Sequence, residues 1–219
     1  MDAAYQRLVR RDDALVQLLT PPFDTSEQHP GYIRGYPPGV RENGGQYTHG
    51  AIWAVMAFAV LGDARRAWEL LGMINPINHG RSVLDVATYR VEPYVMAADV
   101  YAMAPHTGRG GWSWYTGSAG WMYRLILESL LGVERAADKL RLSPCLPADW
   151  KEFTLHYRYL DTTYTITVGA AETADGEPGV WVDGELQQDA VISLVNDLVP
   201  HSARVLVRSP EVQRRVAAS

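Results

Sequence analysis

The hydrophobic pattern of the chain changes at about residue 140, from the spacing of helices to the alternation of strands. Before this point, an apolar run such as residues 51–59 has helical length, and Gly- and Pro-rich loops separate such runs. After it, residues 153–159 and 163–168 alternate apolar with polar side chains, as half-buried strands do. The pattern predicts an all-α part over residues 1–140 and a small antiparallel β domain over residues 141–219.

Helical spacing and breaking residues locate the elements of the first part. Asp63 is a predicted N-cap, and the pair Asp183-Gly184 predicts a hairpin turn in the β domain. Long loops separate the predicted helices, so the helices do not form an obvious closed bundle. We therefore expect the helical part of the chain to be one portion of a larger helical architecture. The predicted helices cover residues 2–20, 46–61, 64–71, 92–101 and 117–131.

Composition excludes several classes of protein. The 219 residues carry a net charge of -5, so no general attraction to nucleic acid or anionic lipid is expected. No run approaches the roughly 18 apolar residues of a membrane-spanning helix. The single cysteine, Cys145, excludes an internal disulfide, and no histidine or cysteine pair has metal-ligand spacing. We therefore predict neither a metal site nor a membrane span.

Residues 35–49 form a loop that is rich in polar chemistry. Pro37 and Pro38 disfavour helix there, and Arg41, Glu42 and His49 lie around a glycine pair just before an apolar helix. Such a loop can mount a binding site on a rigid scaffold. The alternative is a structural turn whose polar groups only satisfy one another.

A second polar segment lies at residues 108–121, where Thr116-Gly117-Ser118 begins the last predicted helix. Free backbone N–H groups, the helix dipole and two hydroxyls favour an anion there, although a plain hydroxyl N-cap is the alternative. Nearby tryptophans offer surfaces on which a sugar can stack. With Arg41 and His49, these groups indicate a site for an anion and a polyol, as in phosphorylated or phosphorolysed sugars.

Several other charged side chains are candidates for parts of this site. Glu42 is the best candidate for a carboxylate acting on a substrate, and a second carboxylate would come from a set of three acidic residues further along the chain. Arg90 and Glu92 are expected to form a salt bridge, and His79 is expected to be structural. The three candidate partners of Glu42 are Asp85, Glu92 and Asp99.

Four segments, taken in order, resemble glycoside hydrolase family 94, the family of cellobiose phosphorylase-like enzymes. The similarity is greatest to the C-terminal phosphorylase region of cyclic β-1,2-glucan synthases. The segments are GYIRGYPPGVRENGGQYTHG (31–50), LLGMINPINHGR (70–81), YRVEPYVMAADVY (89–101) and GRGGWSWYTGSAGWMYR (108–124). The resemblance implies part of an (α/α)6 barrel followed by a jelly-roll-like β-sandwich.

The resemblance also implies a reaction and a set of residues. Members cleave β-glucosidic bonds with inorganic phosphate and invert the anomeric centre, giving α-glucose 1-phosphate without a further cofactor. His49, Thr116 and Gly117 match phosphate-binding positions, and Arg41 matches an acceptor-sugar position. Glu42, beside it, is carried over as a sugar contact.

One motif of the family is missing from the chain. The family's general acid is an aspartate of a Trp-x-Asp type motif upstream of the ENGG segment, and no such motif occurs here. We therefore expect a C-terminal fragment of a larger cytoplasmic enzyme, inactive alone, that dimerises or needs the missing upstream half. The alternative is a non-catalytic carbohydrate-binding or structural remnant.

Overall fold

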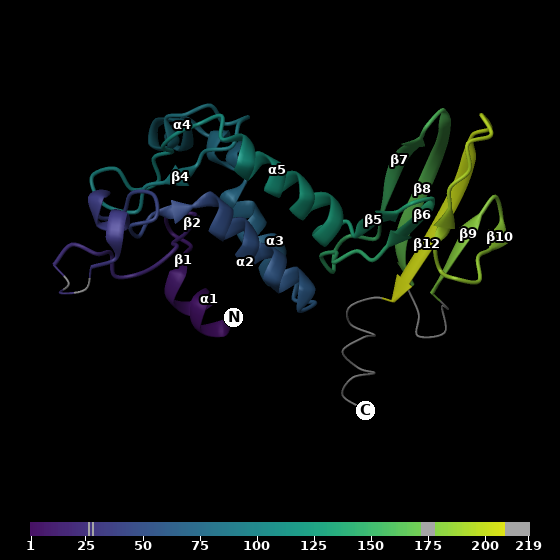
Figure 1. Ribbon diagram of the computed structural model, residues 1–219, viewed down its shortest axis with the longest axis horizontal. Coiled ribbons are helices and arrows are strands. Elements are labelled where there is room, and N and C mark those ends of the chain that lie inside the picture. The colour runs from purple at the N-terminus through teal and green to yellow at the C-terminus, as the bar shows by residue number, and fades with distance from the viewer. Residues whose placement is uncertain (26, 28, 172–177, 209–219) are drawn as a thin grey trace. The chain divides into compact units, whose positions relative to one another are not determined.

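The computed structural model describes residues 1–25, 27, 29–171 and 178–208 (Figure 1). The chain separates into two compact units, Met1–Leu125 and Ile126–Ser219. This boundary precedes the predicted division at residues 140/141. The difference arises because a hairpin of β5 (Val133–Ala136) and β6 (Lys139–Leu142) follows the last predicted helix and begins within the part that we predicted to be all-α.

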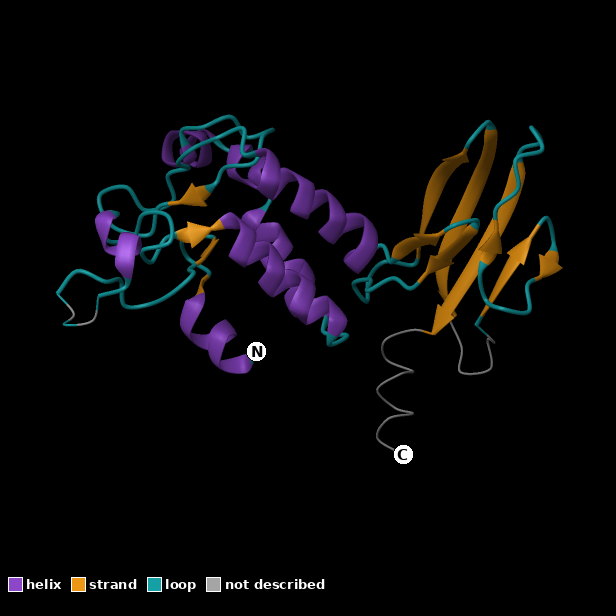
Figure 2. Cartoon of the chain, in the orientation of Figure 1, coloured by secondary structure: helices purple, strands orange, loops and turns teal. Residues whose placement is uncertain are grey.

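The described part of the first unit contains five α-helices and two small sheets (Figure 2). Helices α2 and α3 pack against each other through apolar faces that include Ile52, Val55 and Phe58 on α2 and Leu70 on α3. Asp63 caps α3 as predicted, since its carboxylate accepts the backbone N–H of Arg66 at 3.1 Å. The helices are α1 (Asp2–Leu8), α2 (Thr48–Val60), α3 (Ala64–Ile74), α4 (Val83–Tyr89) and α5 (Thr116–Arg124), with 3-10 turns at Gly31–Gly35 and Pro76–Gly80.

The predicted helix over residues 2–20 is wrong beyond Leu8. Strands β1 (Val9–Arg10) and β2 (Leu15–Val16) form a hairpin instead, with Ala14 in the left-handed region at φ 49°. The hairpin buries both residues of β2, and the backbone N–H of Val16 donates to Oε1 of Gln46 at 2.9 Å. This contact, 30 residues away in sequence, fixes a strand where local spacing suits a helix.

The predicted helix over residues 92–101 is also wrong. The helix lies earlier, at α4, and Arg90 ends it in the left-handed conformation at φ 60°. The later residues form strand β4 (Asp99–Val100), which pairs with β3 (Gln46–Tyr47). Residues 96–98 and 100 are all buried, and such continuous burial suits an extended segment packed on both sides.

The last predicted helix corresponds to α5 and a π-helical turn, Leu125–Leu130, after which Gly132 adopts a positive φ of 69°.

The second unit is a pair of sheets that share one apolar core (Figure 2). Leu140, Leu142 and Ile192 of the three-stranded sheet join Tyr164 and Ile166 of the five-stranded sheet in that core.

The five-stranded sheet follows the predicted strand pattern closely, whereas β5 and β6 of the three-stranded sheet were not predicted. The five-stranded sheet is mixed, however, because β12 pairs parallel to β8, so the prediction of a purely antiparallel domain is wrong for this pair. Asp183 and Gly184 form the predicted turn, with φ of 50° and 89°. The five-stranded order is β10 (Glu185–Leu186), β9 (Gly179–Val182), β12 (His201–Arg208), β8 (Thr162–Ala171) and β7 (Glu152–Tyr159); the three-stranded order is β11 (Ile192–Ser193), β6 and β5.

Candidate functional site

The imidazole of His49 lies against the first turn of α5. A Cβ atom added to Gly117 would be 3.0 Å from Nε2 of His49, so only a residue without a side chain leaves this ring in place. His49 is in the first turn of α2, which packs on α5. The two segments that the sequence analysis selected for anion binding therefore meet in space.

The N-terminus of α5 is open to a ligand. Tyr115 occupies the N-cap position, and its side chain makes no capping hydrogen bond to the free N–H groups of the first turn. The hydroxyl of Ser118 is buried and donates to the carbonyl of Tyr115 at 2.9 Å, whereas Thr116 and Gly117 are exposed. An uncapped helix N-terminus carries partial positive charge, so this turn and His49 together form a site suited to an oxyanion.

Aromatic rings surround His49 on three sides. Tyr47 stacks on the imidazole at 5.5 Å between ring centroids, and Tyr115 meets it edge-on at the same distance. Trp53 packs edge-on at 6.1 Å and in turn contacts Trp121. Burial lowers the pKa of His49, and its buried Nδ1 atom has no hydrogen-bond partner among the residues that the structure describes. The imidazole is therefore neutral at neutral pH and held by packing.

Tyr47 and Tyr115 were not predicted as site residues. A hydrogen bond between their hydroxyls, together with burial, raises the pKa of Tyr47 to about 12. Both tyrosines adjoin residues that the sequence did indicate, since Tyr47 is two positions before His49 and Tyr115 directly precedes Thr116. That adjacency was the only available signal.

Arg41 and Glu42 form a second charged group near these tyrosines. The Nε atom of Arg41 is 3.6 Å from Oε2 of Glu42, and both atoms are buried with no hydrogen bond in the described part of the chain. The pKa of Tyr47 responds first to the hydroxyl of Tyr115 and to burial; beyond these, the charge of Glu42 raises this pKa and the charge of Arg41 lowers it. This pair of charged groups is thus within electrostatic range of the His49 site and offers both donors and acceptors to a polyol.

The loop that carries Arg41 is held rigidly. Asn43 is fully buried, accepts the N–H of Phe23 at 2.7 Å, and donates to the carbonyls of Phe23 and Tyr36. The N–H of Arg41 donates to Oδ2 of Asp99 at 2.9 Å, and Arg41 has a positive φ of 47°. These bonds fix the backbone on which Arg41 and Glu42 are mounted.

The three carboxylates considered as partners of Glu42 each have a structural contact. Asp99 accepts the Arg41 N–H, Asp85 accepts the hydroxyl of Ser82 at 2.7 Å, and Glu92 accepts the indole N–H of Trp114 at 3.3 Å.

The structure also bears on the predicted salt bridge between Arg90 and Glu92 and on the predicted structural role of His79. The predicted salt bridge between Arg90 and Glu92 is wrong, because Nε of Arg90 donates instead to the carbonyl of Ala87 at 2.9 Å. His79 is structural as expected: it bonds the carbonyl of Met73 at 2.7 Å and stacks on Tyr89.

Comparison with known proteins decides the family. Residues 1–132 match the model of the glycosyl hydrolase 94 superfamily, catalytic domain. The chain belongs to this superfamily. It is 48% identical over 190 residues to the cyclic beta-(1,2)-glucan synthase NdvB of Rhizobium meliloti (strain 1021), covering 87% of this chain and 7% of that protein.

Two phosphorylases of the glycosyl hydrolase 94 superfamily are also similar. Solabiose phosphorylase of Paenibacillus borealis is 29% identical, with 85% of this chain and 24% of that protein covered. The 1,2-beta-oligoglucan phosphorylase of Listeria innocua serovar 6a (strain ATCC BAA-680 / CLIP 11262) is 30% identical, with 67% of this chain and 14% of that protein covered. The chain thus spans a quarter or less of the length of these relatives.

No helix among residues 1–25, 27, 29–171 and 178–208 is long and apolar enough to cross a membrane. Within the same described ranges, no three His, Cys, Asp or Glu side chains gather as metal ligands. The candidate site is therefore built from an imidazole, a helix N-terminus and a nearby pair of charged groups.

Proposed function

We propose that His49 and the first turn of α5 bind inorganic phosphate for the phosphorolysis of a β-1,2-glucan. The observation that carries this proposal is the approach of His49 Nε2 to within 3.0 Å of the Cβ position of Gly117, beside a helix N-terminus whose N-cap side chain makes no capping hydrogen bond. The names of two relatives, a cyclic beta-(1,2)-glucan synthase and a 1,2-beta-oligoglucan phosphorylase, support the choice of glucan. Arg41 and Glu42 contact the sugar.

In the proposed reaction, a phosphate oxygen attacks the anomeric carbon on the face opposite the departing sugar. The new C–O bond inverts that centre and gives α-glucose 1-phosphate, while the glycosidic oxygen leaves with a proton. The backbone N–H groups of Thr116 and Gly117 and the neutral imidazole of His49 hold the nucleophile in position. Such positioning is a major source of rate, because it prepays the entropy of bringing two reactants together.

A polypeptide outside these 219 residues supplies the proton donor in this proposal. General acids typically contribute about 10²–10⁴-fold to rate, so the chain alone is inactive or nearly so. Helix α4 exposes the apolar side chains of Val83, Leu84 and Val86, which supports the presence of a partner surface that covers them. We propose that it is the remainder of an (α/α)6 barrel, or a second copy of the chain.

The test separates binding from turnover. Titration calorimetry with inorganic phosphate should show binding to the parent chain and about tenfold weaker binding to His49→Gln, since a hydrogen bond to a charged group contributes about 1.5–3 kcal/mol. His106→Gln, at an exposed histidine, is the control. Equal phosphate affinity in the parent and His49→Gln would refute the site.

A non-catalytic carbohydrate-binding role is the second candidate. The absence of the Trp-x-Asp type motif from the sequence favours it, because no proton donor to a sugar is identified among these residues. Incubation with β-1,2-glucooligosaccharides and phosphate, in the presence of an upstream polypeptide of a relative, distinguishes the two functions. Formation of glucose 1-phosphate supports phosphorolysis, whereas sugar binding without turnover supports the second role.

A further inference from the structure

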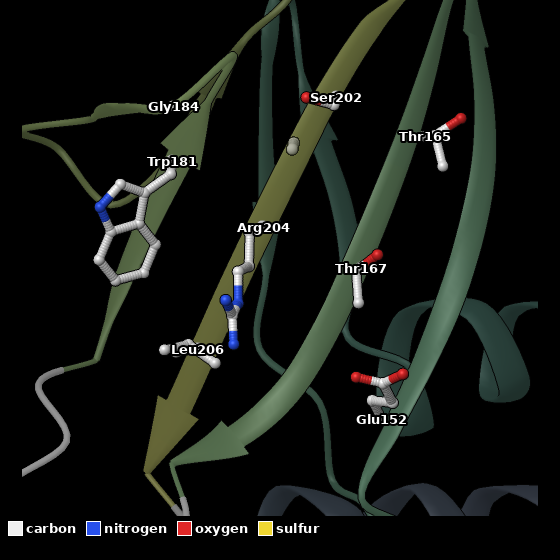
Figure 3. A pocket seen from close by; sticks show the side chains of 9 residues that line it. Glu152, Thr165, Thr167, Trp181, Gly184, Ser202, Arg204 and Leu206 are labelled. Carbon is white, nitrogen blue, oxygen red and sulfur yellow. The ribbon is translucent and has the colours of Figure 1, made fainter.

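The outer face of the five-stranded sheet carries a hollow of about 700 Å³, far along the chain from the site described above. Figure 3 shows that its lining side chains come from four strands, with Trp181 on β9, Arg204 on β12, Thr167 on β8 and Glu152 on β7. The apolar core lies on the other face of this sheet, so these side chains are not needed to build the fold.

We infer that this hollow is a second carbohydrate-binding site, one that holds a β-glucan chain away from the phosphate site. The inference rests on the proposed β-glucan substrate. It assigns a function to the second unit, which lies almost wholly outside the region matched by the family model.

The indole of Trp181 lies flat on the sheet because Gly179 has no side chain. A Cβ atom at Gly179 would be 2.8 Å from Cη2 of the indole and 3.1 Å from its Cζ3, so any larger residue would lift the ring. Leu186, on the paired strand β10, borders the same spot, with its Cδ1 atom 3.2 Å from that position. In Figure 3 the ring is seen broad side on, facing out from the sheet. A flat, supported indole is a surface on which the apolar face of a sugar ring stacks.

Hydrogen-bonding groups continue from this ring across the sheet. Trp181 pairs in register with Arg204, and Arg204 pairs with Thr167. Neighbouring strands are about 4.8 Å apart, so this row extends about 10 Å, enough for more than one sugar unit. Side chains in such a row point to the same face, so the donors lie beside the stacking surface.

The charges of the hollow fit a neutral ligand. Arg204 and Glu152 place one cation and one anion on the same surface, and their side chains make no hydrogen bond or ion pair within the described residues. A phosphate group would meet the carboxylate of Glu152, and an ammonium group would meet Arg204. A neutral polyol can donate to the carboxylate and accept from the guanidinium, as glucan hydroxyls do.

The experiment uses the full chain carrying Arg41→Ala and His49→Gln, which disable the proposed phosphate and acceptor site. Calorimetric titration with a long linear β-1,2-glucooligosaccharide should still show binding in this background. Adding Trp181→Ala should weaken that binding about tenfold, as expected for loss of a stacking ring. Gly179→Val, which lifts the ring, should weaken it as well, whereas Trp181→Phe should retain most of it.

Thr163→Ala is the control, because Thr163 is exposed on β8 at the same face but outside the hollow. Thermal unfolding followed by circular dichroism confirms that each variant folds. Glucan binding that is equal in the background chain and its Trp181→Ala variant, or absent from both, overturns the inference. A Trp181→Ala variant that loses self-association in light scattering but keeps glucan affinity also overturns it, since the face is then a protein interface. The phosphate affinity of the parent chain tests the proposed function separately.

Discussion

The backbone N–H of Arg41 donates a hydrogen bond to the carboxylate of Asp99 at 2.9 Å, across 58 residues of sequence. Asp99 is only 1% exposed and also accepts the backbone N–H of Trp112, so one carboxylate joins the loops on either side of the site. Gly111 packs so closely that a Cβ there would be 2.2 Å from Oδ1 of Asp99. Asp99 is therefore a positioning residue for Arg41.

Replacing Asp99 with Asn should destabilise the first unit and weaken sugar binding. The amide has the same size, but its NH₂ group would face one of the two backbone N–H donors of Arg41 and Trp112. Leaving a buried donor unsatisfied costs about 1–3 kcal/mol. Urea unfolding measures the loss, and Asp12→Asn, at an exposed site, is the control. Unchanged stability in Asp99→Asn would show that the carboxylate does not hold the loops together.

Tyr115 should act on phosphate binding through its ring and not through its hydroxyl. The edge of the ring packs against His49 at 5.5 Å between centroids, whereas the hydroxyl bonds to Tyr47. Tyr115→Phe should therefore keep phosphate affinity and lose about 0.5–1.5 kcal/mol of stability with the hydrogen bond. Tyr115→Ala should lose phosphate affinity, because the imidazole is then free to turn. Calorimetry with phosphate checks both, and equal affinities in the two variants would contradict this role.

The second unit contains a histidine that should make its stability depend on pH. His201 lies between Asp183, with Nδ1 to Oδ2 at 2.6 Å, and Asp197, with Nε2 to Oδ1 at 3.2 Å, and it stacks on Tyr164. The hydrogen bond to Asp183, ahead of the opposing effect of burial, raises the pKa of His201. The bond with His201 lowers the pKa of Asp183, and the pKa of Asp197 is also lowered, chiefly by the N–H of Val199.

The sign of each shift defines the pH range in which these contacts stabilise the fold. A raised histidine pKa adds stability that is complete below the unfolded value of about 6.5 and lost as pH rises through the folded pKa. Lowered aspartate pKa values add stability that is present above about 3.9 and lost as pH falls through the folded values. The melting temperature of the second unit should therefore fall as pH rises from about 6 to about 8. This slope should flatten in His201→Gln and persist in the control His156→Gln; an unchanged slope in His201→Gln would exclude the mechanism.

The anion-binding chemistry of His49 and that of the first turn of α5 could each be predicted, because the chemistry of each segment is local. A histidine after a glycine pair and a Thr-Gly-Ser helix start both indicate anion binding without knowledge of the fold. The cap at Asp63 and the turn at Asp183-Gly184 were confirmed for the same reason, since a few neighbouring residues determine them.

Features that depend on distant partners could not be predicted. The spacing of leucines before residue 20 suits a helix, but the bond from Val16 to Gln46 selects a hairpin. The alternation in β12 (His201–Arg208) is the same whether it pairs parallel or antiparallel, so its parallel pairing with β8 has no local signal. The role of Asp99 depends on Arg41, far away in sequence, and was likewise invisible.

Two glycines of α5 provide the sharpest test of the phosphate site, because their surroundings differ at the same helix. A methyl group at Gly117 would lie 3.0 Å from Nε2 of His49, whereas one at Gly120 would meet nothing within 4 Å. Neither glycine has a positive φ, so the backbone accepts alanine at both positions, but the imidazole of His49 must move to make room for a methyl group at position 117. Gly117→Ala should therefore weaken phosphate binding in calorimetry, while Gly120→Ala should stabilise the exposed helix by up to about 1 kcal/mol and leave phosphate affinity unchanged. Because both variants remain folded, a Gly117→Ala protein that binds phosphate as tightly as Gly120→Ala would show that the anion does not bind between His49 and this helix.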